Sequence, residues 1–218
     1  MPTSRSYRDS CGMARALDVV GERWALLVVR ELLFAPQRFS DLRHALPNAS
    51  SNLLADRLRE LENHGVIRRR KLASAAGSHV YELTKWGRKL EPIALALSEW
   101  GIDAPHPPEP TSLSATSVLI FLRVGAHPDP AAAPIVCRLE LDGSIWTVRV
   151  DSGNVQIESG EPATADISLR TSPKTLGSLL ADPASLDSAL TDGRVAFVGD
   201  RSALDRMLLL YGAEDSQT

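Results

Sequence analysis

Residues 40–83 read SDLRHALPNASSNLLADRLRELENHGVIRRRKLASAAGSHVYEL. A start at Ser40-Asp41 and a stop at Pro47 predict a short helix, and a longer helix follows it. In the longer helix three leucines recur at helical spacing and face one core: Leu54, Leu58 and Leu61. Its polar residues project from the opposite side: Asn52, Asp56, Arg59 and Asn63. One face of this helix therefore packs, and the other is free to contact a partner.

A hairpin is predicted directly after this helix. Gly65 ends the helix, Val66-Ile67 begins a strand, and residues 80–83 return antiparallel to it across the small-residue turn 73–78. The first strand carries a basic run whose members alternate in direction, so that about half of them face the same way: Arg68, Arg69, Arg70 and Lys71. Helix, turn, helix and basic hairpin, in that order, predict a winged helix-turn-helix, an arrangement that reads duplex DNA.

Charge is distributed unevenly along the chain, whose net charge is −3. Residues 1–110 carry 16 Lys and Arg against 13 Asp and Glu, whereas residues 111–218 carry 8 against 14. Within residues 1–90 the excess reaches +7, because only 9 acidic residues face the same 16 basic ones. Phosphate contacts release condensed counterions and require such a basic region. We expect the acidic half to point away from DNA.

A proline-rich segment divides the chain. Four prolines in residues 103–110 stiffen an extended connection and block helix continuation. We therefore expect an N-terminal winged-helix domain at 1–102, which binds DNA and dimerises. A linker at 103–116, a second domain at 117–212 and a tail at 213–218 follow it. Apolar patterns predict three further helices in the first domain, the last of them kinked at Pro92: one through Met13, Leu17 and Val20, then Trp24–Phe34, then Thr84–Trp100.

The second domain has a different texture. β-Branched and alternating segments, separated by Gly or Pro turns, predict four antiparallel strands and a fifth strand after them: 118–124, 135–141, 144–150, 154–159 and 166–170. Helical patterns and one short strand follow: helices at 172–181, 185–190 and 202–211, and the strand at 195–198. The second domain is therefore predicted as an antiparallel sheet with helices, and the chain as an α+β protein.

Eleven residues are candidates for DNA contact. Asn pairs bidentately with adenine, and Arg pairs with guanine or phosphate. The candidates lie in the first short helix, the reading helix and the hairpin: Arg38, Ser40, Ser51, Asn52, Arg57, Arg59, Arg68, Arg69, Arg70, Lys71 and His79. The alternatives are a solvated helix face, a solubilising charge run and, for Ser40, a helix cap. Asp56 and Glu60 on the same surface limit how many positions can touch phosphate.

The first domain resembles the HxlR-type family of bacterial winged-helix regulators over about residues 11–101. The residues that carry the resemblance are Cys11, GERW at 21–24, RFSDL at 38–42, LADRLRELE at 54–62, GVIRR at 65–69 and YELTKWG at 81–87. The resemblance implies a homodimer, built from the first and last helices of the domain, that binds a pseudopalindromic double-stranded DNA operator. It also implies a repressor or activator of nearby genes.

The second half resembles the sterol carrier protein type 2 fold, through ADISL at 165–169, the helix after Ser172, and DGRV at 192–195 before Gly199-Asp200. Members often enclose an apolar tunnel for fatty acyl or sterol-like molecules, so the resemblance implies an apolar small-molecule effector. Six residues are candidates to line such a pocket: Phe121, Trp146, Val148, Leu176, Leu180 and Met207. The alternative is that the same side chains fill an ordinary core, a distinction that sequence does not make.

The two cysteines are too few for a disulfide scaffold or a four-ligand zinc site. Cys11 has two readings: a small buried hydrophobe, or, as in some relatives, a sensor of oxidants with Arg8 and Arg15 nearby. Cys137 lies in a strand pattern and is expected in the core.

Further expectations are negative. The five histidines are scattered and no phosphate loop is present, so we expect no enzyme, metal or cofactor. No apolar run suggests a membrane span or signal peptide, which favours a cytoplasmic protein without membrane contact. The expected function is sequence-specific transcription regulation. The alternatives are an apolar-ligand carrier in which the winged helix serves dimerisation, and a Cys11 redox regulator with an inert second domain.

Overall fold

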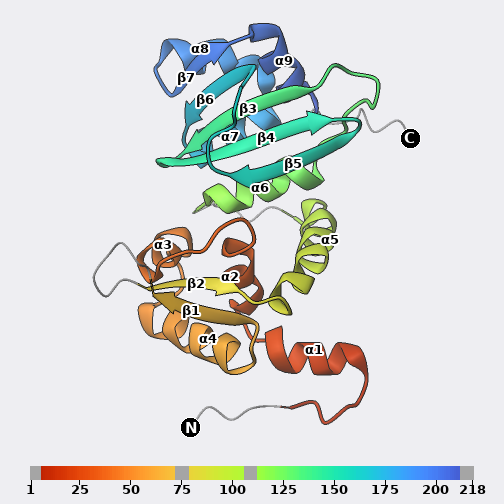
Figure 1. Ribbon diagram of the computed structural model, residues 1–218, viewed down its shortest axis with the longest axis vertical. Coiled ribbons are helices and arrows are strands. Elements are labelled where there is room, and N and C mark those ends of the chain that lie inside the picture. Colours follow the sequence, from red (N-terminus) through yellow and green to blue (C-terminus); the bar gives the residue numbers. More distant parts are fainter. Residues whose placement is uncertain (1–5, 72–78, 106–111, 212–218) are drawn as a thin grey trace. The chain divides into compact units, whose positions relative to one another are not determined.

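The computed structural model describes residues 6–71, 79–105 and 112–211 (Figure 1). The chain divides into two compact units, Met1–Leu95 and Ala96–Thr218. Helix α5 (Glu91–Ile102) spans the division, and the predicted linker follows this helix. The predicted turn at 73–78 and the tail at 213–218 lie outside the described residues, as do residues 106–111 of the linker.

The N-terminal unit is a helix-turn-helix followed by a two-stranded hairpin. Its elements follow in chain order: α1 (Gly12–Val20), α2 (Ala25–Glu31), α3 (Phe39–Ala45), α4 (Ser51–Asn63), β1 (Ile67–Lys71), β2 (His79–Leu83), a 3-10 helix (Gly87–Leu90) and α5. The strands pair antiparallel, from Ile67 opposite Leu83 to Lys71 opposite His79. The longer helix predicted after Pro47 is present as α4, and the predicted hairpin is also confirmed.

The core of this unit forms where α4 packs against α2 and β1. The three leucines predicted to face it, Leu54, Leu58 and Leu61, are at most 1% exposed. The helix begins because the Ser50 hydroxyl accepts a hydrogen bond from the Leu53 N–H, at 3.3 Å. It ends before Gly65, whose φ of 72° favours glycine. These local signals fix which face of α4 stays outside.

Helix α2 is shorter than the predicted Trp24–Phe34. Trp24 has a left-handed φ of 78° and precedes the helix, and Leu32 leaves helical geometry at its end. Leu32 and Leu33 are nevertheless buried, with 2% and 7% exposure. The apolar run was therefore longer than the helix because buried residues continue after the helix ends.

The start of α3 corrects the expectation for Ser40. The helix begins at Phe39, and the Arg38 N–H donates to the Asp41 carboxylate at 3.0 Å. Ser40 is the second helical residue and donates its hydroxyl proton to Asp41 at 3.1 Å. A carboxylate near a helix N-terminus satisfies orphan backbone donors, so Asp41 takes the role expected of Ser40.

No helix begins at Thr84. The Thr84 hydroxyl donates to the carbonyl of Gly65 at 2.7 Å and accepts a hydrogen bond from the Gly87 N–H at 3.0 Å. These bonds hold a turn, so the predicted long helix begins only at Glu91. Pro92 is its second residue and causes no kink there, because a missing N–H costs nothing in the first turn.

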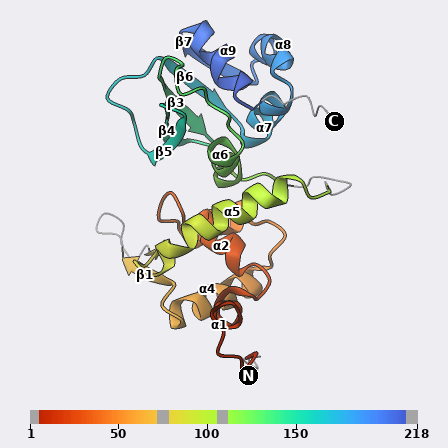
Figure 2. The ribbon, with the colours of Figure 1, turned by 90° about the vertical axis from the view of Figure 1, so that its right-hand side faces the viewer.

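The C-terminal unit is a five-stranded sheet with helices, as predicted for an α+β domain (Figure 2). Its elements are α6 (Ala115–Val124), β3 (Ile135–Leu141), β4 (Ser144–Asp151), β5 (Asn154–Ser159), β6 (Ile167–Thr171), α7 (Pro173–Ala181), a 3-10 helix (Pro183–Ser185), α8 (Leu186–Thr191), β7 (Val195–Gly199) and α9 (Arg201–Leu209). The strand order is β5-β4-β3-β6-β7. Strands β3 and β6 pair in parallel, and the other neighbours pair antiparallel.

The segment predicted as a strand at 118–124 is helix α6, so that prediction was wrong. The Ser114 hydroxyl accepts a hydrogen bond from the Ser117 N–H, which starts the helix. Five of its residues are buried: Thr116, Val118, Leu119, Ile120 and Leu122. A helix buried on more than one side lacks a 3.6-residue apolar stripe and resembles a buried strand in its sequence.

Candidate nucleic-acid interface

The outer face of α4 carries the central candidate residues. Ser51 and Asn52 are exposed in the first turn of the helix, and Arg59 is exposed two turns later. Arg59 donates from Nη1 to Asp56 Oδ1 at 2.8 Å, and the two side chains are 66% and 54% exposed. Asp56 therefore orients a neighbouring arginine on the surface, one of the ways in which a carboxylate is compatible with DNA contact.

Arg57 does not belong to this face. Its side chain is only 12% exposed, it forms an ion pair with Glu60, and its Nη1 lies 3.8 Å from a carboxylate oxygen of Glu22. The buried Nε atom has no hydrogen-bond partner among the described residues. This geometry argues against direct DNA contact by Arg57 and instead ties α4 to the segment before α2.

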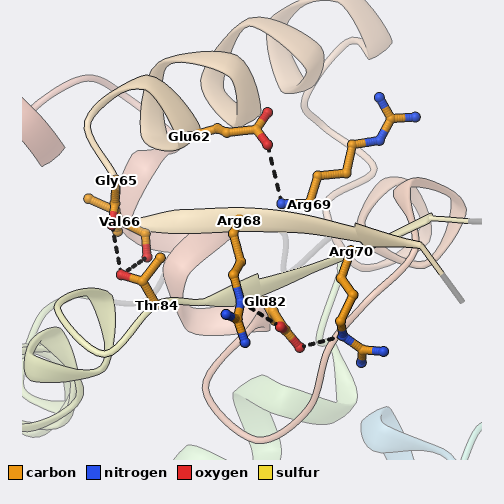
Figure 3. Close-up of polar contacts among 8 residues, drawn as sticks. All are labelled: Glu62, Gly65, Val66, Arg68, Arg69, Arg70, Glu82 and Thr84. Atoms are coloured by element: carbon orange, nitrogen blue, oxygen red, sulfur yellow. Dashed lines mark hydrogen bonds and ion pairs between the residues drawn. The ribbon is translucent and has the colours of Figure 1, made fainter.

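The basic strand β1 divides its side chains between two faces of the hairpin (Figure 3). Arg69 lies on the side of α4, where its backbone N–H donates to the Glu62 carboxylate at 3.2 Å. Arg68 and Arg70 lie on the opposite side with Glu82. Neither Arg69 nor Lys71 forms an ion pair with another residue of the described part of the chain. The predicted alternation is therefore present for Arg68, Arg69 and Arg70.

Glu82 is a buried charged residue of the hairpin that sequence reasoning did not single out. Its residue exposure is 8%, and its two carboxylate oxygens accept from Arg68 Nε at 2.7 Å and from Arg70 Nε at 3.1 Å. Burial acts to raise the pKa of Glu82, but the hydrogen bonds from Arg70 and Arg68, together with the positive charges of these two arginines, outweigh burial and hold the pKa below its usual value. The cross-strand register, which places Arg68 opposite Glu82, was the signal that could have found it.

The remaining candidates lie at the start of α3 and on the hairpin. Arg38 and Ser40 are exposed at the start of α3, and His79 is half-buried on β2 opposite Lys71. DNA contact by Arg38, Ser40, Arg69, Lys71 and His79 stays a prediction.

The two cysteines lie in different environments. Cys11 is exposed and caps α1, where its Sγ accepts a hydrogen bond from the Ala14 N–H at 3.3 Å. The reading of Cys11 as a buried hydrophobe was therefore wrong. Cys137 is fully buried, as predicted, and burial raises the pKa of its thiol to about 12.

Most residues predicted to line an apolar pocket lie in the core of the C-terminal unit. Phe121 is half-buried, whereas the other five are at most 3% exposed: Trp146, Val148, Leu176, Leu180 and Met207. One open pocket of this unit is lined by other residues, three of them with polar side chains: Arg123, Ala126, Pro128, Gly153, Asn154, Val155 and Gln156. An apolar ligand site therefore stays a prediction.

The described residues contain neither a membrane-spanning helix nor a cluster of metal ligands. No helix among them is both long and apolar enough to cross a bilayer. No group of three or more His, Cys, Asp and Glu side chains among them is placed to hold a metal ion.

Two family models match the chain, one in its N-terminal part and one in its C-terminal part. Residues 19–107 match the model of the HxlR-like helix-turn-helix. Residues 129–207 match that of the SCP-2 sterol transfer family. The predicted combination of a winged helix with a sterol-carrier-like domain is confirmed.

Relatives of the N-terminal part are bacterial. The HTH-type transcriptional regulator YvaP of Bacillus subtilis is 39% identical over 89 residues, which cover 41% of this chain and 82% of YvaP. The regulator Rv3095 of Mycobacterium tuberculosis is 34% identical over 129 residues, which cover 59% of this chain and 78% of Rv3095. A solved structure of the redox regulator HypR in its oxidized form is 32% identical, with a TM-score of 0.42, and the match covers 44% of this chain and 100% of that one.

Proposed function

The chain belongs to the HxlR-like helix-turn-helix family of transcriptional regulators, and on that premise we propose that it acts as a homodimer on a pseudopalindromic operator. The observation that carries the proposal is the exposed polar face of α4 beside the basic strand β1. In a winged helix this pairing places one element in the major groove and the other beside the sugar-phosphate backbone.

Base reading is assigned to the exposed residues of α4. Asn52 suits a bidentate contact with adenine, and Arg59, oriented by Asp56, suits guanine. Phosphate contacts from the start of α3 and from β1 fix the position of the helix without reading sequence. Arg57 supports α4 from inside and is not part of the contact set.

Dimerisation is assigned to two apolar stripes on α1 and α5. Met13 and Leu17 are one turn apart on α1 and are 75% and 40% exposed. Ile93, Leu97 and Trp100 follow helical spacing on α5 and are 55%, 47% and 74% exposed. Contiguous exposed apolar surface marks an interaction site in a protein of this kind. A second copy of the chain is the partner that the operator symmetry requires.

Control by an apolar effector is assigned to the C-terminal unit, on the basis of its sterol-carrier family. The effector would act by population shift. If the two recognition helices must lie about 34 Å apart to enter successive major grooves, a ligand that prefers another spacing lowers operator affinity by its differential binding alone.

A footprint on the DNA upstream of the chain's own gene tests the proposal. A dimer should protect two half-sites whose centres are about 10 base pairs apart, or a multiple of that spacing. An apolar carrier with a winged helix used only for dimerisation would leave no footprint and would retain cargo at high salt, where DNA contacts weaken. That outcome would favour the carrier function over transcription regulation.

The exposure of Cys11 supports a second mode of control. An exposed thiol is accessible to oxidants, and its modification at the start of α1 would alter one of the two proposed dimer stripes. A Cys11→Ser variant separates this mode from effector control. Release of DNA by oxidant that persists in the variant would exclude Cys11 as the sensor.

A further inference from the structure

Glu82 stands out among the charged groups of the N-terminal unit because one buried carboxylate holds two exposed arginines. Its side chain is 11% exposed, whereas the side chains of Arg68 and Arg70 are 67% and 48% exposed. A solubilising surface charge has no need of a buried partner. The arrangement instead fixes two long, flexible side chains in one place on the hairpin (Figure 3).

The atoms used in these bonds decide what remains available. Each arginine reaches Glu82 through Nε, at 2.7 Å for Arg68 and 3.1 Å for Arg70. Both hydrogen bonds use Nε alone, and the Nη atoms of both arginines make no hydrogen bond to another described residue. Two guanidinium groups are therefore held side by side with their terminal donors free, and the three charged groups together keep a net charge of +1. Planar donor pairs of this kind match phosphate oxygens.

We propose that Glu82 is a positioning residue that holds Arg68 and Arg70 as a preformed phosphate-binding pair on the face of the hairpin away from α4. The inference rests on the proposed function, since the phosphate belongs to the DNA backbone. Fixing both arginines before binding removes the entropy that each would lose on contact. Because phosphate contacts carry no sequence information, the pair contributes to affinity for any duplex.

Positioning and charge alone predict opposite effects of a Glu82→Gln substitution. Removal of a carboxylate raises the positive charge of the hairpin, so simple attraction predicts tighter binding by this variant. Positioning predicts weaker binding, by roughly tenfold, because two charge-assisted hydrogen bonds to phosphate no longer have a fixed geometry. The salt dependence should also weaken, by about one unit of slope for each phosphate that the variant no longer neutralises.

The experiment measures dissociation constants of the full chain by fluorescence anisotropy at several salt concentrations. Its probes are a duplex from upstream of the chain's own gene and an unrelated duplex of equal length. Glu82→Gln should weaken binding to both duplexes by a similar factor. The effect should vanish in a background that already lacks the pair, Arg68→Gln with Arg70→Gln. Arg69→Gln, on the other face of the same strand, is the matched control, and its effect should add to that of Glu82→Gln.

Unchanged or tighter DNA binding by Glu82→Gln overturns the inference. An effect of Glu82→Gln that persists in the variant with Arg68→Gln and Arg70→Gln overturns it as well. If Glu82→Gln fails to fold, the Arg68→Gln and Arg70→Gln variants decide the question, and an unchanged affinity and salt slope overturn it. Salt-dependent DNA binding by the unaltered chain tests the proposed function separately from the role of Glu82. If the unaltered chain does not bind DNA, both the proposed function and the inference are wrong. If it binds, the variants test the role of Glu82 alone.

Discussion

The same residue types have opposite environments in two regions of the molecule. Trp100 on α5 and Met13 on α1 are 74% and 75% exposed, whereas Trp146 on β4 and Met207 on α9 are 3% and 0% exposed. Side chains of equal hydrophobicity therefore stabilise the fold in one region and remain uncovered in the other. Under the proposed dimer, the exposed side chains of α1 and α5 are available for association, whereas those of the C-terminal sheet and its helices form a core.

Substitution of each tryptophan by alanine should have the largest effect and tests whether the two regions differ in their contribution to stability. Trp146→Ala removes a buried side chain and should lower the free energy of unfolding by about 3–5 kcal/mol. In the monomer, Trp100→Ala removes an exposed side chain and should change the free energy of unfolding by about 0.5 kcal/mol or less. Urea denaturation followed by circular dichroism measures both. Equal losses in the two variants would mean that Trp100 belongs to a core.

A charge placed on the α5 stripe should disrupt assembly and leave the fold intact. Leu97→Glu is expected to convert dimers into monomers and to weaken operator binding by about 100-fold, because two linked half-site contacts become independent. Sedimentation velocity and anisotropy measure the two effects. Leu209→Glu on α9, at a leucine that is 68% exposed, is the matched control. A dimer that survives Leu97→Glu would remove α5 from the interface.

Arg59 and Arg57 are close together on α4, but they are proposed to have different roles. Under the proposed function Arg59 contacts bases, and Arg57 stabilises the position of the helix. Arg59→Ala should reduce the preference for operator over unrelated DNA by about 1–3 kcal/mol, with stability almost unchanged. Arg57→Ala should instead lower stability, because its side chain is 12% exposed and neutralises Glu60. Competition anisotropy and thermal unfolding provide the two readouts. Reversed results would exchange the two assignments.

The smallest expected effect is a dependence of stability on pH that arises from Glu82. Since the pKa of this carboxyl is lowered in the folded protein, its stabilising contribution is fully present above the usual carboxyl pKa and disappears as the pH falls through the lowered value. Thermal unfolding from neutral to acidic pH should therefore converge for the unaltered chain and Glu82→Gln at the acidic end. Curves separated by a constant gap at every pH would contradict this assignment.

The structure was predicted well where the sequence has a regular apolar spacing and turn residues at the ends of the element. Leucine spacing gave the buried face of α4, and Gly65 marked its end. Strands β3 and β5 have the predicted bounds, because alternation and neighbouring turn residues define them together. Local signals of this kind act within a few residues and need no knowledge of the rest of the chain.

Features that depend on distant neighbours were not predicted. Helix α6 is buried on several sides, so its sequence lacked the stripe that separates helix from strand. The parallel pairing of β6 with β3 joins segments far apart in the chain. The contacts of Glu82 with Arg68 and Arg70 depend on strand register, and nothing in the local sequence distinguishes a buried carboxylate from a solvated one.

The most direct test of the central claim is the affinity of the unaltered chain for its own upstream DNA over a salt series, with unrelated DNA as competitor. A regulator that reads bases through α4 and grips phosphates through β1 should bind tightly and resist the competitor. Its affinity should fall linearly on logarithmic axes as salt rises. Binding that does not distinguish the two duplexes at any salt concentration would contradict base reading by α4 at this DNA.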